Sequence, residues 1–110
     1  MNIPRRPIYE KPAKVGPNLA YLALVRQLPC CVCERFGMRQ MSPTAAHHPI
    51  HGRYGNEKVP DTDAIPLCEG HHQGSWDTSK IAIHRGQESW EAAYGPDTDY
   101  VAATRERVGL

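Results

Sequence analysis

The amino-acid sequence predicts a small α+β domain, because segments with helical periodicity stand on both sides of two short extended segments. The chain has 110 residues, the length of one domain. It contains ten prolines and nine glycines, and only 40% of its residues are hydrophobic. A core this thin would gain from an additional cross-link, such as a bound metal ion or a disulfide.

The N-terminal part of the chain divides into a basic arm and a helix. Residues 1–17 hold four basic residues, one Glu and four prolines, which favour an extended arm that contacts phosphates or is simply solvated. Leu19, Leu22 and Val25 then recur at helical spacing up to residue 28, and a proline ends the pattern. We therefore expect a flexible arm over residues 1–17 and a folded domain over residues 18–110.

Two further helices are expected near the C-terminus. Residues 87–94 place two aromatic side chains one turn apart, and a Gly-Pro pair follows as a stop signal. Residues 99–108 form the last helix, with Asp97 or Thr98 as its N-cap. The aromatic residues of these helices are most simply explained as core.

The extended segments lie between these helices. Residues 44–50 and 63–67 flank a glycine-containing loop and predict a β-hairpin with a wide connection. Pro49 and Pro66 favour irregular, edge-like strands. Residues 81–84 alternate briefly between apolar and other residues and predict a third extended segment.

The cellular compartment decides how the four cysteines are interpreted. The longest apolar run, residues 21–25, is far shorter than the ~20 residues of a membrane span, and no apolar signal core follows Met1. We therefore expect a cytoplasmic protein with no membrane partner. In a reducing compartment, cysteines more often hold metal or do chemistry than form disulfides.

Two pairs of ligand-type residues share one spacing, Cys30-x2-Cys33 and Cys68-x2-His71. Each pair forms a tight turn that presents both donors to one ion, which is typical of a tetrahedral zinc site. Cys31 should point away from that ion. Two disulfides or four unrelated thiols are the alternatives, and the second leaves the paired spacing unexplained. We expect a structural Zn²⁺ at these four residues.

Five histidines remain, namely His47, His48, His51, His72 and His84. Adjacent strand residues point to opposite faces, so only one of His47 and His48 would normally reach a given ion. Two or three imidazoles around a divalent cation, with a further histidine as general base, are typical of a one-metal phosphodiesterase. A second structural zinc, or no ion at all, is the alternative.

These residues resemble the zinc-containing HNH nucleases, also called ββα-metal or His-Me finger nucleases. The likeness is carried by Cys30-x2-Cys33, His47-His48 and Ile65-Pro66-Leu67-Cys68-x2-His71-His72. Ile83-His84-Arg85-Gly86, followed by an aromatic-containing helix, is further similar to the phage recombination-enhancement nucleases of the Ref type. The resemblance covers about residues 19 to 95. It implies a small zinc-stapled ββα-metal (HNH) domain with flanking helices.

The resemblance also implies a role for each residue of the site. His48 would be the general base. His47 would be a ligand of the catalytic divalent ion, as would His72 at the start of the active-site helix, and His84 is the candidate third ligand. The expected ion is Mg²⁺, with Mn²⁺ or Zn²⁺ as alternatives. Asp63, near the place of the middle Asn of the motif, would brace the hairpin or orient His48.

The function implied by the resemblance is hydrolysis of DNA phosphodiesters by an endonuclease that leaves a 5′-phosphate, in a bacterial or phage-infected host cell. The Ref-like members further imply a part in recombination and a RecA-type recombinase filament as partner. The formal net charge is only +1, but basic residues outnumber acidic ones between positions 26 and 58. Arg53 and Arg85, close in sequence to the site histidines, are the expected DNA contacts.

Two alternatives to a DNA nuclease stay open. A non-catalytic zinc module that binds DNA or a protein partner needs only the Cys/His site and the basic residues. The surplus histidines speak against it, because a binding module needs no general base beside a second ligand cluster. An RNA-directed or toxin-like nuclease could share the same site.

Overall fold

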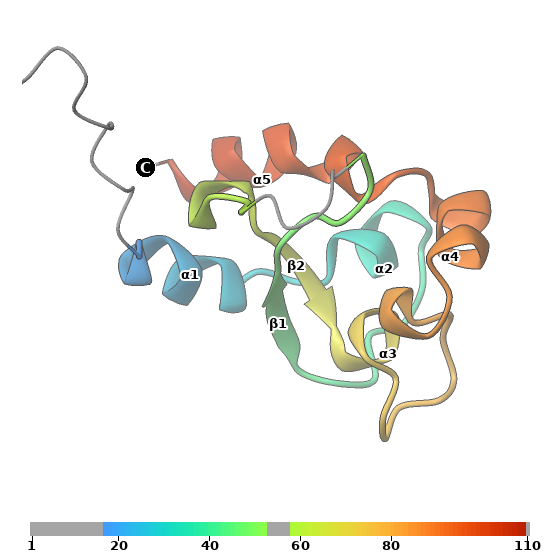
Figure 1. The fold of residues 1–110 in the computed structure, drawn as a ribbon. Helices are drawn as coiled ribbons and strands as arrows, with labels where there is room; N and C mark the ends of the chain where they lie inside the picture. Colours follow the sequence, from blue (N-terminus) through green and yellow to red (C-terminus); the bar gives the residue numbers. More distant parts are fainter. Residues whose placement is uncertain (1–16, 53–57, 110) are drawn as a thin grey trace, which may run out of the picture.

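The computed structural model describes residues 17–52 and 58–109. The element order is α1 (Leu19–Arg26), α2 (Cys31–Arg35), β1 (Thr44–His47), β2 (Ile65–Cys68), α3 (Glu69–His72), α4 (Gln87–Tyr94) and α5 (Val101–Val108). Short 3-10 turns stand at Asp61–Asp63, Ile83–Arg85 and Asp97–Tyr100. The protein is a small α+β domain around a two-stranded sheet (Figure 1). Of the basic arm expected over residues 1–17, only Pro17 falls within the described residues.

The sheet consists of β1 and β2, paired antiparallel with Thr44 opposite Cys68 and His47 opposite Ile65. The hairpin with a wide connection is therefore confirmed. All four residues of β2 are buried, whereas only the last residue of β1 is. In a two-stranded sheet each strand has a free edge, which tolerates the missing N–H of Pro66. The register brings the end of β2, where α3 begins, beside the start of β1.

Helix α1 covers one side of the sheet. It begins at Leu19 because the side chain of Asn18 accepts a hydrogen bond of 3.0 Å from the backbone nitrogen of Tyr21. Its buried face contains Tyr21, Leu22 and Val25. The helix ends at Arg26, two residues before the expected end. α1 also contacts α5, and the start of α1 and the end of α5 lie at the same end of the molecule (Figure 1).

The C-terminal helices close the core. α4 has the predicted bounds, and its Trp90 and Tyr94 are buried with their rings edge to face at 5.3 Å between centroids. α5 begins at Val101, later than expected, because a 3-10 turn precedes it. Asp97 is not the N-cap of this helix, which has no side-chain cap at all. Its carboxylate is turned instead toward the segment after β1.

Three short elements differ from the sequence prediction. Residues 81–84 do not form a strand, because the adjacent Ala82 and Ile83 are both buried and a 3-10 turn begins at Ile83. α2 and α3 were not expected as helices. They have five and four residues, too few for an apolar periodicity to be recognised in the sequence.

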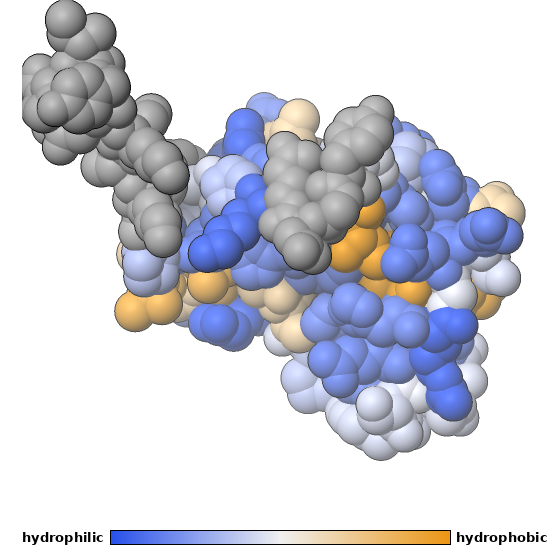
Figure 2. All heavy atoms as spheres, in the orientation of Figure 1, coloured by the Kyte–Doolittle hydropathy of each residue, from blue (hydrophilic) through white to orange (hydrophobic). Residues whose placement is uncertain are grey.

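On the face shown in Figure 2, the described residues are largely hydrophilic, and apolar side chains form small separate areas. In the part of the chain that the structure describes, no helix is both long enough and apolar enough to cross a membrane.

Candidate metal centres and active site

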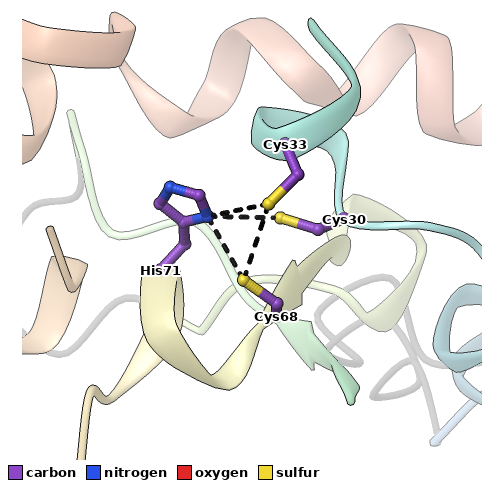
Figure 3. A group of neighbouring side chains, drawn as sticks. All are labelled: Cys30, Cys33, Cys68 and His71. Atoms are coloured by element: carbon purple, nitrogen blue, oxygen red, sulfur yellow. Dashed lines mark hydrogen bonds between the residues drawn. The ribbon is translucent and has the colours of Figure 1, made fainter. Parts of the chain in front are cut away.

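Four buried side chains converge where α2, β2 and α3 meet, namely Cys30, Cys33, Cys68 and His71 (Figure 3). Nδ1 of His71 lies 3.5 Å from Sγ of Cys30, 3.5 Å from Sγ of Cys33 and 3.2 Å from Sγ of Cys68. The sulfurs of Cys33 and Cys68 are 3.9 Å apart. Sulfur and nitrogen donors around a tetrahedral zinc-sized ion are about 3.5–3.8 Å apart. The four side chains can therefore hold one metal ion.

Local structure explains how these donors meet. Cys30 precedes α2 and Cys33 lies in its first turn, while the backbone nitrogen of Cys30 donates to Oε1 of Gln40 at 2.8 Å. Cys68 ends β2, and His71 follows one turn later in α3. Each pair thus sits at the start of a short helix, where a separation of three positions turns both donors to one side. All four cysteines of the chain are free thiols, so the disulfide alternative is not supported.

The thiols of this group differ in acidity. Hydrogen bonds from the Cys30 thiol and from His71 hold the pKa of Cys68 well below its usual range. The same interaction with Cys68, together with burial, raises the pKa of Cys30. A thiolate is the form that binds a metal ion, so the lowered pKa of Cys68 favours its role as a ligand. Burial raises the pKa of Cys31 to about 12, and that thiol lines a surface cavity outside the group, as predicted.

Two aromatic residues of α4 pack against the Cys/His group. The ring of Tyr94 meets that of His71 edge to face, 5.0 Å between centroids. Nε1 of Trp90 donates to the carbonyl oxygen of His71 at 3.1 Å. The Trp90 bond holds the backbone of His71 and Tyr94 packs against its ring, whose Nδ1 faces the three sulfurs (Figure 3). Nε2 of His71 is buried and has no hydrogen-bond partner among the described residues.

A second group of possible ligands consists of His47, His72 and His84, whose donor atoms all lie within 4.8 Å of one another. Nε2 of His84 is 3.1 Å from Nε2 of His72. The ring of His47 meets both other rings nearly at right angles, at 5.1 and 5.5 Å between centroids. Two nitrogens bound to one ion at about 2.0–2.1 Å are about 2.9–3.4 Å apart. The three histidines singled out in the sequence therefore come together in a geometry that fits a divalent ion.

This second group opens to the surface. The side chain of His47 is 1% exposed, His72 is half-buried and His84 is exposed. Burial and the neighbouring His47 and His84 lower the pKa of His72 to about 4, and burial also lowers that of His84. Near neutral pH these two rings are therefore uncharged, which is the form that ligates a metal ion.

The position of His72 differs from the expectation. It was expected at the start of a helix, but it is the last residue of α3, which begins at Glu69. The chain leaves the helix at Gly74, where φ is +63°, a backbone conformation that favours glycine. A longer helix, with a ligand one turn further on, is thereby excluded.

Gly74 also allows the third histidine to approach. A Cβ at this position would lie 2.7 Å from Cβ of Ala82 and 3.3 Å from Cδ of Arg85. Nη1 of Arg85 donates to the carbonyl oxygen of Gly74 at 2.9 Å. The loop after α3 and the 3-10 turn of His84 are thus packed directly against each other, which brings His84 to His72.

Asp97 is a residue of this site that the sequence analysis missed. Its Oδ2 lies 2.9 Å from Nε2 of His47 and accepts from the backbone nitrogen of Ile50 at 2.8 Å, while Oδ1 accepts from that of His51 at 3.2 Å. Although burial opposes ionisation, the hydrogen bonds from His47 and Ile50 hold the pKa of Asp97 below its usual range. When Nε2 of His47 donates to this carboxylate, Nδ1 is left unprotonated and available to a metal ion. No local signal in the sequence distinguishes Asp97 from a helix cap.

His48 lies next to His47 in the chain but outside the three-histidine group. Its Nε2 is 2.8 Å from Oδ1 of Asp61, and its side chain is 37% exposed. Oδ2 of Asp61 accepts from the backbone nitrogen of Asn18 at 2.7 Å, and the bond with His48 lowers the pKa of Asp61. Of the two roles expected for Asp63, the contact that would orient His48 is made by Asp61 instead, while Asp63 pairs with Arg105 of α5.

The structure describes one of the two residues expected to contact DNA. Arg85 is exposed and directly follows His84, with its guanidinium tied to the loop after α3. Arg53 lies outside the described residues.

Fold and site together define a small α+β protein with two separate groups of potential metal ligands. One is buried and rich in thiols, and the other consists of three imidazoles that open to the surface. The chain belongs to the family described as "Protein of unknown function (DUF968)", whose family model matches residues 2–108. No curated protein and no solved structure matches this chain.

Proposed function

We propose that this protein is a metal-dependent endonuclease of the HNH type that hydrolyses DNA phosphodiester bonds. The observation that carries the proposal is the three-histidine group, whose donor atoms lie within 4.8 Å of one another. A fourth histidine, His48, follows His47 in the chain and is bonded to Asp61. The separate Cys/His group would already supply a stabilising cross-link. A second, solvent-accessible ligand set is therefore best explained by chemistry rather than by folding.

The donor types favour particular ions at the two groups. Three sulfurs and one nitrogen suit a structural Zn²⁺ at Cys30, Cys33, Cys68 and His71. Three imidazoles suit Zn²⁺ and other transition ions, whereas Mg²⁺, the ion implied by the resemblance, prefers oxygen ligands. Mg²⁺, Mn²⁺ and Zn²⁺ are therefore all to be compared at His47, His72 and His84. A divalent ion bound there would polarise the scissile phosphate and stabilise the leaving oxygen.

His48 is the proposed general base. With Nε2 donating to Asp61, Nδ1 carries a lone pair that can accept a proton from the attacking water. As the water oxygen bonds to phosphorus, the bond from phosphorus to the 3′-oxygen breaks, which leaves a 5′-phosphate and a 3′-hydroxyl. The leaving oxygen takes its proton from solvent. The carboxylate of Asp61 stabilises the imidazolium that forms on His48.

The partners follow from the same proposal. Arg85, exposed next to His84, would neutralise a DNA phosphate near the reacting bond. Action in recombination together with a RecA-type recombinase filament rests on the resemblance to the Ref-like nucleases alone.

The decisive experiment is a cleavage assay on single-stranded DNA, duplex DNA and RNA. Each substrate is incubated with Mg²⁺, Mn²⁺ or Zn²⁺, with and without recombinase filaments. We expect DNA cleavage that needs a divalent ion and disappears in the His48→Ala variant, which should keep the zinc content and melting temperature of the wild type. A His48→Ala variant that cuts at the wild-type rate would contradict the mechanism.

The same assay separates the two alternatives. Tight DNA binding without cleavage under any divalent ion would support the non-catalytic zinc module. Cleavage of RNA but not of DNA would support the RNA-directed nuclease.

A further inference from the structure

Trp76 is a large apolar side chain that the fold holds out toward solvent. Trp76 lies in the loop between α3 and the 3-10 turn of His84, and it is 63% exposed. The other tryptophan, Trp90, is 0% exposed. An exposed aromatic residue on a freely moving loop would need no explanation, but this loop is tied down on both sides of Trp76.

The carboxylate of Glu69 fixes the backbone at this position. Oε2 of Glu69 accepts from the backbone nitrogen of Ser75 at 3.0 Å, and Oε1 accepts from those of Trp76 and Asp77 at 2.8 and 3.0 Å. These three bonds satisfy consecutive backbone donors with a residue of α3. These bonds therefore fix the position of the Trp76 backbone relative to α3, the helix that carries His72.

Asp77 anchors the other side of the tryptophan. It is buried, and its carboxylate accepts from the hydroxyl of Ser42 at 3.0 Å and from that of Ser79 at 2.6 Å. A Cβ on Gly70 of α3 would collide with this carboxylate, so the loop lies directly against the helix. The ring of Trp76 is thus presented by an ordered loop, and a ligand that binds it need not order the backbone first.

The loop also places Trp76 close to the three-histidine group. Trp76 is four positions after His72 and two positions after Gly74, which Arg85 contacts directly. Two residues of chain span at most about 7 Å. The tryptophan, the exposed His84 and the cationic Arg85 therefore share one edge of the domain. Figure 1 shows this loop extending away from the sheet beyond α3.

We propose that Trp76 stacks on an unpaired nucleobase adjacent to the phosphate bound at the three-histidine group. This rests on the proposed function and narrows its substrate to single-stranded or locally opened DNA. In a duplex, each base is covered by its neighbours on both faces and cannot stack on a side chain. Proteins hold single strands with exposed aromatic rings and nearby cations: the ring stacks on the base, and the cation binds the phosphate.

The test measures binding without cleavage, in the zinc-loaded protein carrying His48→Ala. The probes are a single-stranded oligodeoxynucleotide and a blunt hairpin duplex of the same sequence. Because Trp90 is buried and hydrogen-bonded to the backbone, quenching of tryptophan fluorescence reports on Trp76. We expect the single strand to quench the fluorescence and the blunt duplex to leave it nearly unchanged.

Substitutions at the same position provide the matched controls. Trp76→Ala should weaken binding of the single strand roughly tenfold or more and change binding of the duplex little. Trp76→Phe keeps a stacking ring and should restore most of the affinity, measured by fluorescence anisotropy of a labelled strand. Both variants should melt at the temperature of the parent protein, because the side chain is exposed.

Three outcomes would overturn the proposal. These are single-strand binding without quenching, unchanged affinity in Trp76→Ala, and self-association that Trp76→Ala abolishes while nucleic-acid binding is unaffected. The last would assign the surface to a protein contact. These measurements use a variant in which catalysis is disabled. A negative binding result therefore does not contradict the proposed cleavage, and absence of cleavage by the wild type does not contradict base stacking by Trp76.

Discussion

Oδ2 of Asp97 lies 2.9 Å from Nε2 of His47, although the two residues are 50 positions apart in the sequence. Both side chains are buried, 0% and 1% exposed. Through its bonds to the backbone of Ile50 and His51, Asp97 also holds the chain that follows His48. A turn near the C-terminus thus sets the orientation of His47 and holds the segment that follows His48.

Asp97→Asn should weaken metal binding by the three-histidine group without unfolding the domain. Oδ2 of Asp97 faces both Nε2 of His47 and the backbone nitrogen of Ile50. An amide nitrogen at this place would lose the Ile50 bond and donate to Nε2 of His47, which moves the ring proton to Nδ1. A neutral amide oxygen at this place would instead hold the proton on Nε2 less strongly than the carboxylate does. We expect affinity for the ion at this site to fall about 10- to 100-fold, with the zinc of the Cys/His group retained. Titration calorimetry of the zinc-loaded protein with a divalent ion measures the change. The exposed Asp99→Asn is the control, and equal affinity in both variants would refute this role of Asp97.

Asp61→Asn should slow cleavage while leaving metal binding intact. The amide cannot stabilise the imidazolium that forms on His48, so we expect single-turnover DNA cleavage to slow by about 10²-fold or more. Asp63→Asn serves as the matched control, since its carboxylate contacts Arg105 instead of His48. If Asp63→Asn slows cleavage as much as Asp61→Asn does, the assignment of Asp61 is wrong.

Cys68→Ala should destabilise the whole domain, because a structural metal site contributes its binding free energy to folding. We expect the variant to lose one equivalent of zinc, measured by metal analysis, and its cooperative melting transition, measured by circular dichroism. Prolonged treatment with a strong chelator should have the same effect on the wild type. Cys31→Ser, at a thiol outside the ligand group, should keep both zinc and the melting transition. A normally melting Cys68→Ala would show that this residue has no structural role.

Gly74→Ala should cost more stability than Gly37→Ala. Both glycines have nearly the same positive φ, +63° and +64°, so both substitutions strain the backbone by about 1–3 kcal/mol. Only at Gly74 would the new Cβ also meet Ala82 and Arg85. We therefore expect a lower melting temperature for Gly74→Ala and weaker metal binding by His72 and His84. Equal melting temperatures would mean that this packing is not needed.

The sequence predicted the parts of the structure that depend on local spacing. The hairpin, the bounds of α4, the start of α1 at Leu19 and the two ligand pairs of the Cys/His group all follow from patterns of a few residues. The short helices α2 and α3 could not be predicted in this way, since one turn leaves no periodicity to detect. The 3-10 turn of His84 was mistaken for a strand for the same reason.

Only the tertiary structure decided which carboxylates serve the histidines. Asp61 and Asp63 are two positions apart and equally plausible in the sequence, yet a 3-10 turn directs the first to His48 and the second to Arg105. Asp97 looks like a helix cap until the fold places it against His47. The spacing of ligands along the chain is a local property that the sequence by itself determined. The pairing of a buried carboxylate with a distant imidazole depends on how the elements pack, because it is the loss of water that makes each the other's hydrogen-bond partner.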